Sequence, residues 1–364
     1  MSTIKIAFVG DICPGGVLHG SPRTCISKEV VDYLKKFDLR VANLESAIGE
    51  GFSFDQDKMR NPKWCNIIYS KDEDVQRLKE IGIDIVSLAN NHVTDLGFEG
   101  LIHTIQVLDQ NNILHFGAGR NNSEADEPVV INLKGKRFAF LGFYDTEVAP
   151  HPATEDSWGV STSDNLIKRI KKAKEKYDYV FVLPHWGFEH IYRPLPRDRK
   201  LAIELIKAGA DGVIGSHPHS IQPYIMYKKK PIFFSLGNFL MPDFYQQPPC
   251  PIWYPDSSID VTNIPIVHKY LSNHKEYVKY IWGKKSRIGL IAEFYISDKI
   301  MINYKLTSLN EKNEITFLGR TTKYDFIFSA LRFFVFLPFY DLFFFLSEGY
   351  LAIRRRLFNI LKKA

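Results

Sequence analysis

The feature that most constrains the fold is an alternation, between residues 4 and 240, of short β-branched runs with amphipathic helical patterns. In residues 72–81, Val75, Leu78 and Ile81 recur at the spacing of one helix face. Similar patterns predict helices at 97–111, 163–176 and 197–208. Strands that alternate with helices are typical of α/β layering. The sequence therefore predicts an α/β protein, and 364 residues with 45% apolar content suffice for a sizeable core.

Polar side chains follow five of the predicted strands at the point where each strand ends. Residues 215–219 read Gly-Ser-His-Pro-His, which places His217 and His219 directly behind the apolar run 212–214. A short loop of paired histidines behind a strand is a common way to hold a metal ion. The other strand ends carry Asp11, Glu45, Asn91 with His92, and His185. We expect these side chains to converge at one edge of the fold.

Each of the two carboxylates has two interpretations. Asp11 follows Gly10 on a tight turn, where glycine permits close approach to a bound ion, or it is a solvated residue of a strand-to-helix turn. Glu45 shares one face of an extended segment with Asn43. An inward Glu is costly unless it meets a cation, so we favour metal ligation by Glu45 over a cap of the next element.

The densest polar run is residues 88–97. Asn91 offers an amide oxygen to a metal, His92 a proton to a leaving oxygen, and Asp95 a carboxylate that can orient the imidazole. The alternative is an Asn-Asn turn in which Asp95 caps the helix that begins near Gly97. Both interpretations can hold for different residues of the run.

The strand end at His185 carries two further polar side chains. His185 is the better ligand because it lies at the strand exit, and Glu189 is predicted to accept a hydrogen bond behind the ligands or to contact substrate. His190 is interpreted as a surface histidine. Asn238, which follows the strand-like run 231–234, is predicted to hydrogen-bond the His-Pro-His loop or the substrate, and we favour structural support of the loop.

The candidate ligands are carboxylates, an amide oxygen and imidazoles, with almost no thiolate. This set suits one or two divalent ions of Mn, Fe or Zn and disfavours Cu(I) or an iron–sulfur cluster. Two neighbouring ions activate a water and clamp the attacking and leaving oxygens of a phosphoryl centre.

Charge and cysteine content exclude several other classes. Lys and Arg number 47 against 41 Asp and Glu, a net charge of +6, so nucleic-acid binding is not expected, whereas an anionic substrate remains compatible. The four cysteines have irregular spacing, which favours a reducing compartment. The first residues read directly as a strand, with neither a basic segment nor a long apolar core, so we expect no signal peptide. We expect a cytoplasmic protein or one peripheral on the cytoplasmic face of the membrane.

Two segments depart from the α/β pattern. Residues 242–285 mix prolines with aromatics and are predicted to be an irregular loop over the site edge or a subdomain excursion, before a hairpin at 287–296 and 299–306. Residues 325–364 form an aromatic tail with a basic end. The tail is predicted to be helical, and it either packs on the body or lies at a membrane surface on anionic lipid. Charges and Pro338 disfavour a transmembrane helix.

In order and content these motifs resemble the capsule-synthesis protein family represented by CapA and PgsA, which is associated with poly-γ-glutamate capsules and related to calcineurin-like metallophosphoesterases. The resemblance covers residues 5–241. The matching motifs are Val9-Gly10-Asp11, Asn43-Leu44-Glu45-Ser46, residues 87–92 with Asp95 and Gly97, His185-Trp186-Gly187 with Glu189, Gly215 with His217-Pro218-His219, and residues 235–239. Six motifs in one order are far more specific than any one of them.

The resemblance implies a two-sheet sandwich flanked by helices, in four layers α/β/β/α, within residues 1–320. It implies that one ion is held by Asp11 and His219, that Glu45 bridges, that the second ion is held by Asn91, His185 and His217, and that His92 is the proton donor. The chain departs from the pattern at Asp11-Ile12-Cys13, where typical phosphoesterases have Asp-x-His, and at Glu45, which replaces an Asp. The first ion is therefore short of a ligand, and Cys13 is interpreted as a loop thiol.

Two hypotheses of function follow. The first is a metal-dependent hydrolase of a phosphoester, or of an amide-linked capsule polymer, in the synthesis of a poly-γ-glutamate-like surface polymer. The second is a non-catalytic assembly or export factor that binds an anionic polymer through the same pocket. Other capsule-synthesis proteins are compatible partners for either role.

Overall fold

The computed structural model describes residues 2–21, 25–60, 66–145, 151–248, 251–255, 258–268 and 275–319, together with Val335, Tyr340, Asp341 and Phe344. Two large sheets dominate this part of the chain. The first has the order β22 (Ile315–Phe317), β21 (Ile300–Leu309), β20 (Ile288–Ile296), β1 (Ile4–Ile12), β2 (Leu39–Leu44), β5 (Ile85–Ser87) and β6 (Leu114–Phe116), with β15 (Asn238–Leu240) also paired to β1. The second has the order β13 (Ile221–Tyr227), β14 (Lys230–Leu236), β12 (Gly212–Ile214), β11 (Tyr179–Trp186), β9 (Lys136–Asp145) and β8 (Val129–Leu133).

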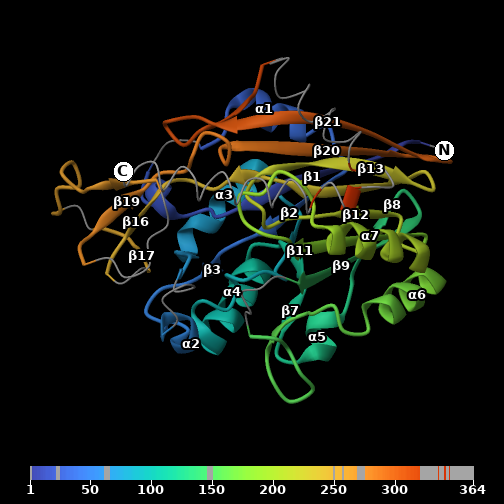
Figure 1. The fold of residues 1–364 in the computed structure, drawn as a ribbon, viewed down its shortest axis with the longest axis horizontal. Helices are drawn as coiled ribbons and strands as arrows, with labels where there is room; N and C mark the ends of the chain where they lie inside the picture. The colour runs from blue at the N-terminus through green and yellow to red at the C-terminus, as the bar shows by residue number, and fades with distance from the viewer. Residues whose placement is uncertain are drawn as a thin grey trace, which may run out of the picture.

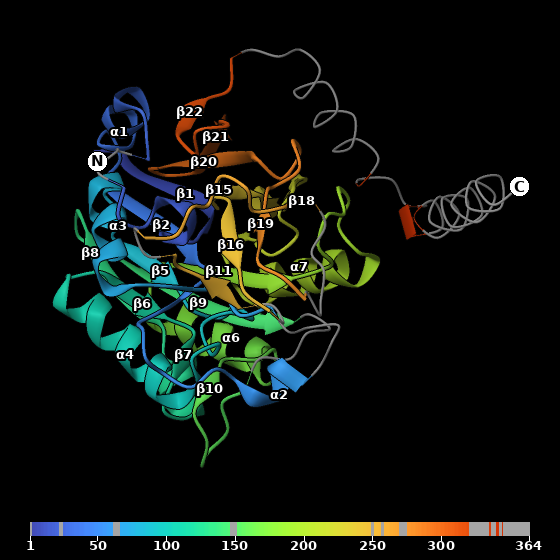
Figure 2. The ribbon, with the colours of Figure 1, turned by 90° about the vertical axis from the view of Figure 1, so that its left-hand side faces the viewer.

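Helices cover the outer face of each sheet (Figures 1 and 2). The first sheet is covered by α1 (Lys28–Leu34), α3 (Gln76–Ile81) and α4 (Gly97–Gln110). The second is covered by α6 (Leu166–Lys176) and α7 (Pro196–Ala208). The sheets pack face to face through Phe8, Phe181 and Phe294, whose ring centroids lie 4.9 to 5.4 Å apart. This is the four-layer α/β/β/α arrangement that the resemblance implies, and the predicted α/β class is confirmed.

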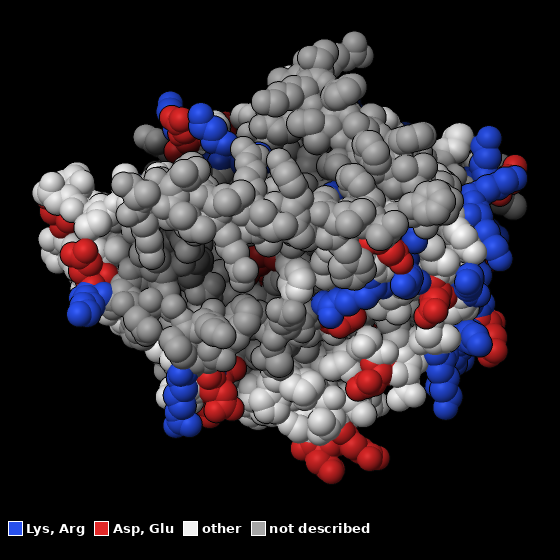
Figure 3. Space-filling view, viewed as in Figure 1, with Lys and Arg blue, Asp and Glu red and all other residues white. Residues whose placement is uncertain are grey.

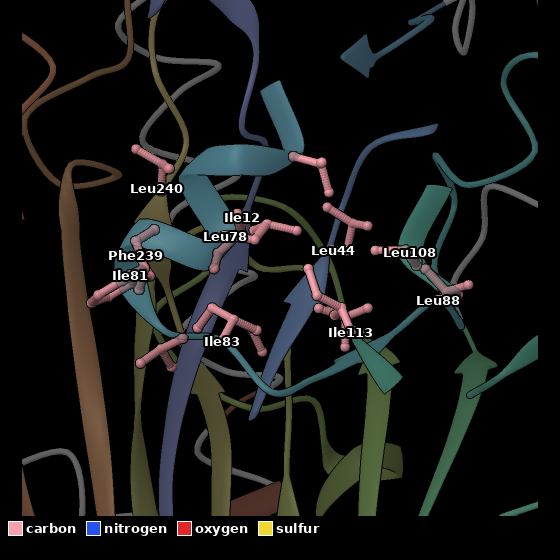
Figure 4. Packing of buried hydrophobic residues seen from close by; sticks show 14 of the residues in the cluster. Ile12, Leu44, Leu78, Ile81, Ile83, Leu88, Leu108, Ile113, Phe239 and Leu240 are labelled. Atoms are coloured by element: carbon pink, nitrogen blue, oxygen red, sulfur yellow. The ribbon is translucent and has the colours of Figure 1, made fainter. Parts of the chain in front are cut away.

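Apolar side chains at helical spacing seal the first sheet from solvent. The helix predicted at 72–81 forms as a short 3₁₀ turn (Asp72–Val75) followed by α3. Leu78 and Ile81 of α3 pack against Ile12, Leu44 and strand residues around them (Figure 4). Each of these four side chains is at most 1% exposed. Burying one aliphatic side chain contributes roughly 1.5–3 kcal/mol, so this layer makes the sheet a stable base for the strand ends.

The central strands of both sheets run parallel, which brings their carboxyl ends to one side. In the first sheet β1 pairs in parallel with β2, and β2 with β5. In the second sheet β11 pairs in parallel with β9 and β12. The backbones approach closely here. A Cβ atom added at Gly10 would lie only 1.8 Å from the carbonyl oxygen of Gly237. The predicted convergence of strand ends therefore occurs, although at the meeting of two sheets and not along the edge of one.

The segment 242–285 is more regular than predicted. It contains a small separate sheet of β17 (Ile252–Trp253), β16 (Phe244–Gln246), β19 (Val278–Tyr280) and β18 (Ile266–Val267). The prediction of an irregular loop is wrong for these stretches, because aromatic packing of Phe244, Tyr280 and Trp282 supplies the order that the sequence period does not show. The predicted hairpin is confirmed, since β20 pairs antiparallel with β21 from Ile296 opposite Ile300.

Shorter elements complete the described chain. They are α2 (Gln56–Arg60), α5 (Asn122–Asp126), the 3₁₀ turn at Gly16–Leu18, and the paired strands β3 (Ala47–Ile48) with β4 (Tyr69–Ser70) and β7 (Ala118–Gly119) with β10 (Gly159–Val160). On the described part of the face in Figure 3, Lys and Arg side chains lie beside Asp and Glu. In the part of the chain that the structure describes, no helix has the length and apolar character needed to cross a membrane.

Four residues of the aromatic tail are described, and they lie on the body. Val335, Tyr340 and Phe344 belong to the apolar cluster beneath α7. The Tyr340 hydroxyl donates to the carbonyl of Pro194 at 2.6 Å, and Asp341 pairs with Lys200 at 3.1 Å. At these positions the packing alternative holds, and the rest of the predicted tail 325–364 lies outside the described residues.

Asp198 in the first turn of α7 is an unusual buried acid. It is 2% exposed, and among the described residues its Oδ1 atom has no hydrogen-bond partner. Burial raises the pKa of this carboxyl to about 7, although the neighbouring Arg197 opposes the shift. The ionised form is therefore held in the fold at a cost in stability.

The change Asp198→Asn is expected to stabilise the protein more at pH 8 than at pH 5. Because the folded pKa lies above the ordinary value of 3.8, the folded wild type keeps a proton that the unfolded chain loses, and its stability falls as pH rises from about 4 to 7. The gap between variant and wild type should widen by ~2 kcal/mol between the two pH values in urea unfolding. Glu204→Gln, at an exposed position of α7, is the control, and an unchanged gap contradicts the interpretation.

Candidate metal centre

Two groups of side chains with metal-ligand chemistry meet where the carboxyl ends of the two sheets face one another. One group is Asp11, Glu45 and His219, and the other is Glu45, His185 and His217. In each group the ligand atoms lie within 4.8 Å of one another. Every one of these residues is at most 3% exposed. Glu45 belongs to both groups, which is the bridging position that the resemblance implies for it.

In the first group, a histidine points at two buried carboxylates. The Nε2 atom of His219 lies 3.3 Å from Glu45 Oε1, and its Nδ1 atom lies 3.4 Å from Asp11 Oδ2. Neither of these two carboxylate oxygens has a hydrogen-bond partner among the described residues. A buried carboxylate oxygen without a donor is costly, and a cation between the three side chains would compensate both oxygens.

In the second group, acceptor atoms crowd around one imidazole nitrogen. His185 Nε2 lies 2.7 Å from Asn91 Oδ1, 3.1 Å from His217 Nδ1 and 3.6 Å from Glu45 Oε1. The other nitrogen, Nδ1, lies 3.0 Å from Ser216 Oγ, which donates to the carbonyl of Pro184 at 3.2 Å. His185 Nδ1 therefore carries the proton and donates a hydrogen bond to Ser216 Oγ. The Nε2 atom keeps its lone pair for a metal ion.

Asn43 and Asn238 hold the ligands of the first group from behind. Asn43 Nδ2 donates to Asp11 Oδ1 at 3.0 Å and to Glu45 Oε2 at 3.2 Å. Asn238 Nδ2 donates to the carbonyl of Ser286 at 2.9 Å, which turns its Oδ1 toward His219 Nδ1 at 2.8 Å. The sequence-based expectation that Asn238 supports the His-Pro-His loop is confirmed.

The His-Pro-His loop has a strained backbone. His217 has a φ of 92° and His219 a φ of 47°, in the left-handed region that side chains other than glycine rarely adopt. Such conformations cost about 1–3 kcal/mol each and persist where surrounding packing imposes them, often at functional sites. The strain points both imidazoles inward from one short loop.

Burial and charge set the protonation of the three histidines. Burial and the neighbouring imidazoles hold the pKa of His185 well below its usual range, and burial lowers that of His217 to about 4. Both rings are thus neutral at pH 7, which is the form that binds metals. For His219, burial lowers the pKa, but the Glu45 and Asp11 carboxylates outweigh it and raise the value to about 10. Burial also raises the pKa of Glu45. A divalent cation bound here would take the place of the proton on His219 and favour the ionised form of Glu45.

His92 and Asp95 pair as the sequence predicts. His92 Nδ1 lies 2.7 Å from Asp95 Oδ2, and both side chains are at most 3% exposed. The alternative that Asp95 caps a helix is wrong, because α4 begins after Leu96 without a side-chain cap and the other contacts of Asp95 are to Lys58 and the backbone N–H of Ile68. Burial and the ammonium of Lys58 lower the pKa of His92, although Asp95 opposes them.

Glu189 and His190 lie outside both ligand groups. Their side chains are 38% and 48% exposed, 3.9 Å apart. Burial of the Glu189 carboxyl raises its pKa, but the imidazoles of His219 and His217 outweigh this and lower it. His190 also lies 3.2 Å from Ser286 Oγ. The surface position predicted for His190 is confirmed, and a role for Glu189 toward substrate stays a prediction.

Sequence reasoning missed several residues that shape the centre. Lys58 comes from a short helix without an apolar stripe, and Trp282 stands against His219 at a centroid distance of 5.1 Å from the segment predicted to be irregular. Ser216 directly precedes the His-Pro-His motif but has no ligand chemistry of its own. Cys13 belongs to neither ligand group, lies 3.6 Å from Ser70 Oγ, and has a pKa raised by burial to about 11. It is a buried thiol in a loop, which agrees with the interpretation of Cys13 as a loop thiol and not as a ligand.

The donor set therefore fits a divalent metal ion. Two orphaned carboxylate oxygens, two neutral imidazoles and an amide oxygen converge within a few Å at the strand ends. Oxygen and imidazole donors suit Mn, Fe and Zn alike, so the identity of the ion is not set by chemistry alone. The fold and the site together define a four-layer α/β protein with a cluster of metal-ligand side chains between its two sheets.

The chain belongs to the family described as Bacterial capsule synthesis protein PGA_cap, whose family model matches residues 5–243. It is 35% identical over 249 residues to the capsule biosynthesis protein CapA of Bacillus anthracis, covering 65% of this chain and 59% of the relative. It is 30% identical over 244 residues to the PGA biosynthesis protein CapA of Bacillus subtilis strain 168, covering 65% and 63%. The matches thus span less than two thirds of the length of either relative.

Solved structures show weaker likeness. A hypothetical protein from Thermus thermophilus has a TM-score of 0.46 at 12% identity, covering 83% of this chain and 98% of that one. A 5'-nucleotidase precursor from the same organism has a TM-score of 0.42 at 12% identity, covering 92% and 58%.

Removing one imidazole should weaken metal binding without unfolding the protein. His217→Ala is expected to raise the dissociation constant for Mn²⁺ by more than roughly 100-fold, because a ligand is lost where even an outer partner costs 10–100-fold. Titration calorimetry on the metal-free protein measures the change. His190→Ala, the matched loss of an imidazole outside both groups, should leave the affinity unchanged. Equal affinities for the two variants would contradict the assignment of His217.

Proposed function

We propose that this chain is a metal-dependent hydrolase of phosphoester bonds that acts in the synthesis of an anionic surface polymer such as poly-γ-glutamate. The observation that carries the proposal is the convergence of Asp11, Glu45, Asn91, His185, His217 and His219 beside the paired side chains of His92 and Asp95. A divalent ion bound there would supply Lewis acidity, which polarises a phosphoryl oxygen and acidifies water.

The chain's own residues supply the rest of the chemistry. Asp95 holds His92 by its Nδ1 atom, so that Nε2 is the nitrogen that, once the ring is protonated, would give its proton to a leaving oxygen. Glu189, partly exposed beside the imidazoles, lies where it can contact the substrate outside the ligand groups. The process is proposed from the relatives, whose names place them in capsule and PGA biosynthesis.

The phosphoesterase proposal predicts metal-dependent turnover that needs His92. Protein loaded with Mn²⁺ or Zn²⁺ should hydrolyse bis(p-nitrophenyl) phosphate or p-nitrophenyl phosphate, and the metal-free protein should not. His92→Asn should lower kcat by roughly 10²–10⁴-fold while metal content, measured by elemental analysis, stays unchanged, because a proton donor and not a ligand is lost. Absence of bound metal after loading overturns the proposal.

A second candidate is a non-catalytic assembly factor that binds an acidic polymer at the same place. It is favoured by the name of a relative from Mycobacterium tuberculosis, a probable polyglutamine synthesis accessory protein, which is 28% identical over 179 residues. The double change Asp11→Ala and His217→Ala separates the two functions in cells. Polymer synthesis that survives loss of the metal favours the assembly factor, and its loss favours the hydrolase.

A further inference from the structure

Lys58 is a buried ammonium group inside the candidate centre. It lies on the short helix α2, its side chain is 7% exposed, and it is the only buried lysine in the part of the chain that the structure describes. Burying a lysine is costly unless the charge is paired and each N–H finds an acceptor. The groups that contact the Lys58 ammonium therefore indicate its role in the centre.

The contacts of the Lys58 ammonium all fall within residues 91–95. The Nζ atom donates to the main-chain carbonyl of Asn91 at 2.8 Å and to Asp95 Oδ1, and it lies 3.3 Å from His92 Nδ1. Since His92 Nδ1 faces the Asp95 carboxylate as a donor, the two acceptors of the ammonium are the Asn91 carbonyl and Asp95. Both acceptors belong to this loop, so Lys58 acts on the loop and not on the reacting group.

Asp95 depends on Lys58 for its charge balance. The carboxylate is 0% exposed. Its Oδ2 atom accepts a hydrogen bond from the backbone N–H of Ile68 at 2.6 Å and faces His92 Nδ1. Its Oδ1 atom accepts a hydrogen bond from the Lys58 ammonium. Without the ammonium, Asp95 would be a buried anion held only by the N–H groups of Ile68 and His92.

Asn91 is held by the same ammonium through its backbone. Lys58 binds the Asn91 carbonyl at 2.8 Å while the Asn91 side-chain oxygen lies 2.7 Å from His185 Nε2. Fixing the peptide fixes the direction in which the side chain leaves it. One ammonium therefore orients both a candidate ligand and the candidate proton donor.

We propose that Lys58 is a positioning residue of the centre, which sets the orientation of Asn91 and His92 by binding the Asn91 carbonyl and the Asp95 carboxylate. The inference rests on the proposed function, because it concerns the same site. It goes beyond that function in assigning a role to α2, a segment outside every motif that the sequence shows.

The test compares four variants with the wild type, one of them Asp95→Asn alone. Lys58→Met removes the ammonium and keeps the side-chain length, but it leaves Asp95 unpaired, and this variant can fail to fold. The double change Lys58→Met with Asp95→Asn removes both charges and should restore the urea midpoint. Arg60→Met, at an exposed position of α2, is the matched control for loss of a cation from the same helix.

The double variant should bind Mn²⁺ about 10–100-fold more weakly than the wild type in titration calorimetry, because Asn91 loses its anchor. Asp95→Asn alone and Arg60→Met should stay within a few fold of the wild type. A double variant with the urea midpoint and the Mn²⁺ affinity of the wild type overturns the proposal, since a merely structural lysine would leave affinity intact at restored stability.

A readout on the metal-free protein separates this proposal from the proposed function. The ring nitrogen signals of His92 in long-range ¹H–¹⁵N NMR should differ between the double variant and Asp95→Asn, which share the same residue at position 95. Identical His92 signals overturn the positioning role. If the wild type binds metal but hydrolyses no phosphoester, the hydrolase proposal fails, and the affinity and NMR results still decide the role of Lys58.

Discussion

The site depends on one electrostatic constraint, the burial of two carboxylates among imidazoles where two sheets meet. Asp11 and Glu45 are fully buried, and each directs one oxygen that has no hydrogen-bond partner among the described residues toward His219. An uncompensated buried anion costs several kcal/mol, and in the metal-free protein the proton on His219 offsets part of that charge. A divalent cation offsets more of it, so the same arrangement that is costly without a cation favours metal binding.

The packing of the two sheets offsets the cost of burying these carboxylates. Parallel strands from both sheets end at the same place, and the aromatic packing of Phe8, Phe181 and Phe294 holds the sheets at a set distance. Ligands at the ends of packed strands lose little further freedom when they bind an ion. The left-handed backbone of His217 and His219 is then a local cost, offset by the packing that surrounds the loop.

Residues around the ligands come from parts of the chain with no strand or helix period. Trp282 packs on His219 from beyond the small sheet, and Lys58 reaches residues 91–95 from a helix of five residues. Neither side chain has ligand chemistry. Their effect is to fix ring and amide orientations, which a centre built from several short loops needs, because each loop alone leaves its side chain several rotamers.

The sequence by itself determined the α/β class, the helices around 72–81 and 97–110, and the candidate ligands at five strand ends, because local periodicity marks each element and parallel strands finish on one side. It also indicated the pairing of His92 with Asp95, three residues apart. Only the tertiary structure decided that the ligands come from two facing sheets, that residues 242–285 contain strands, and that Asp95 binds Lys58 and not a helix end. Those outcomes rest on contacts between segments remote in sequence, and no local pattern records which remote side chain will fill a buried space.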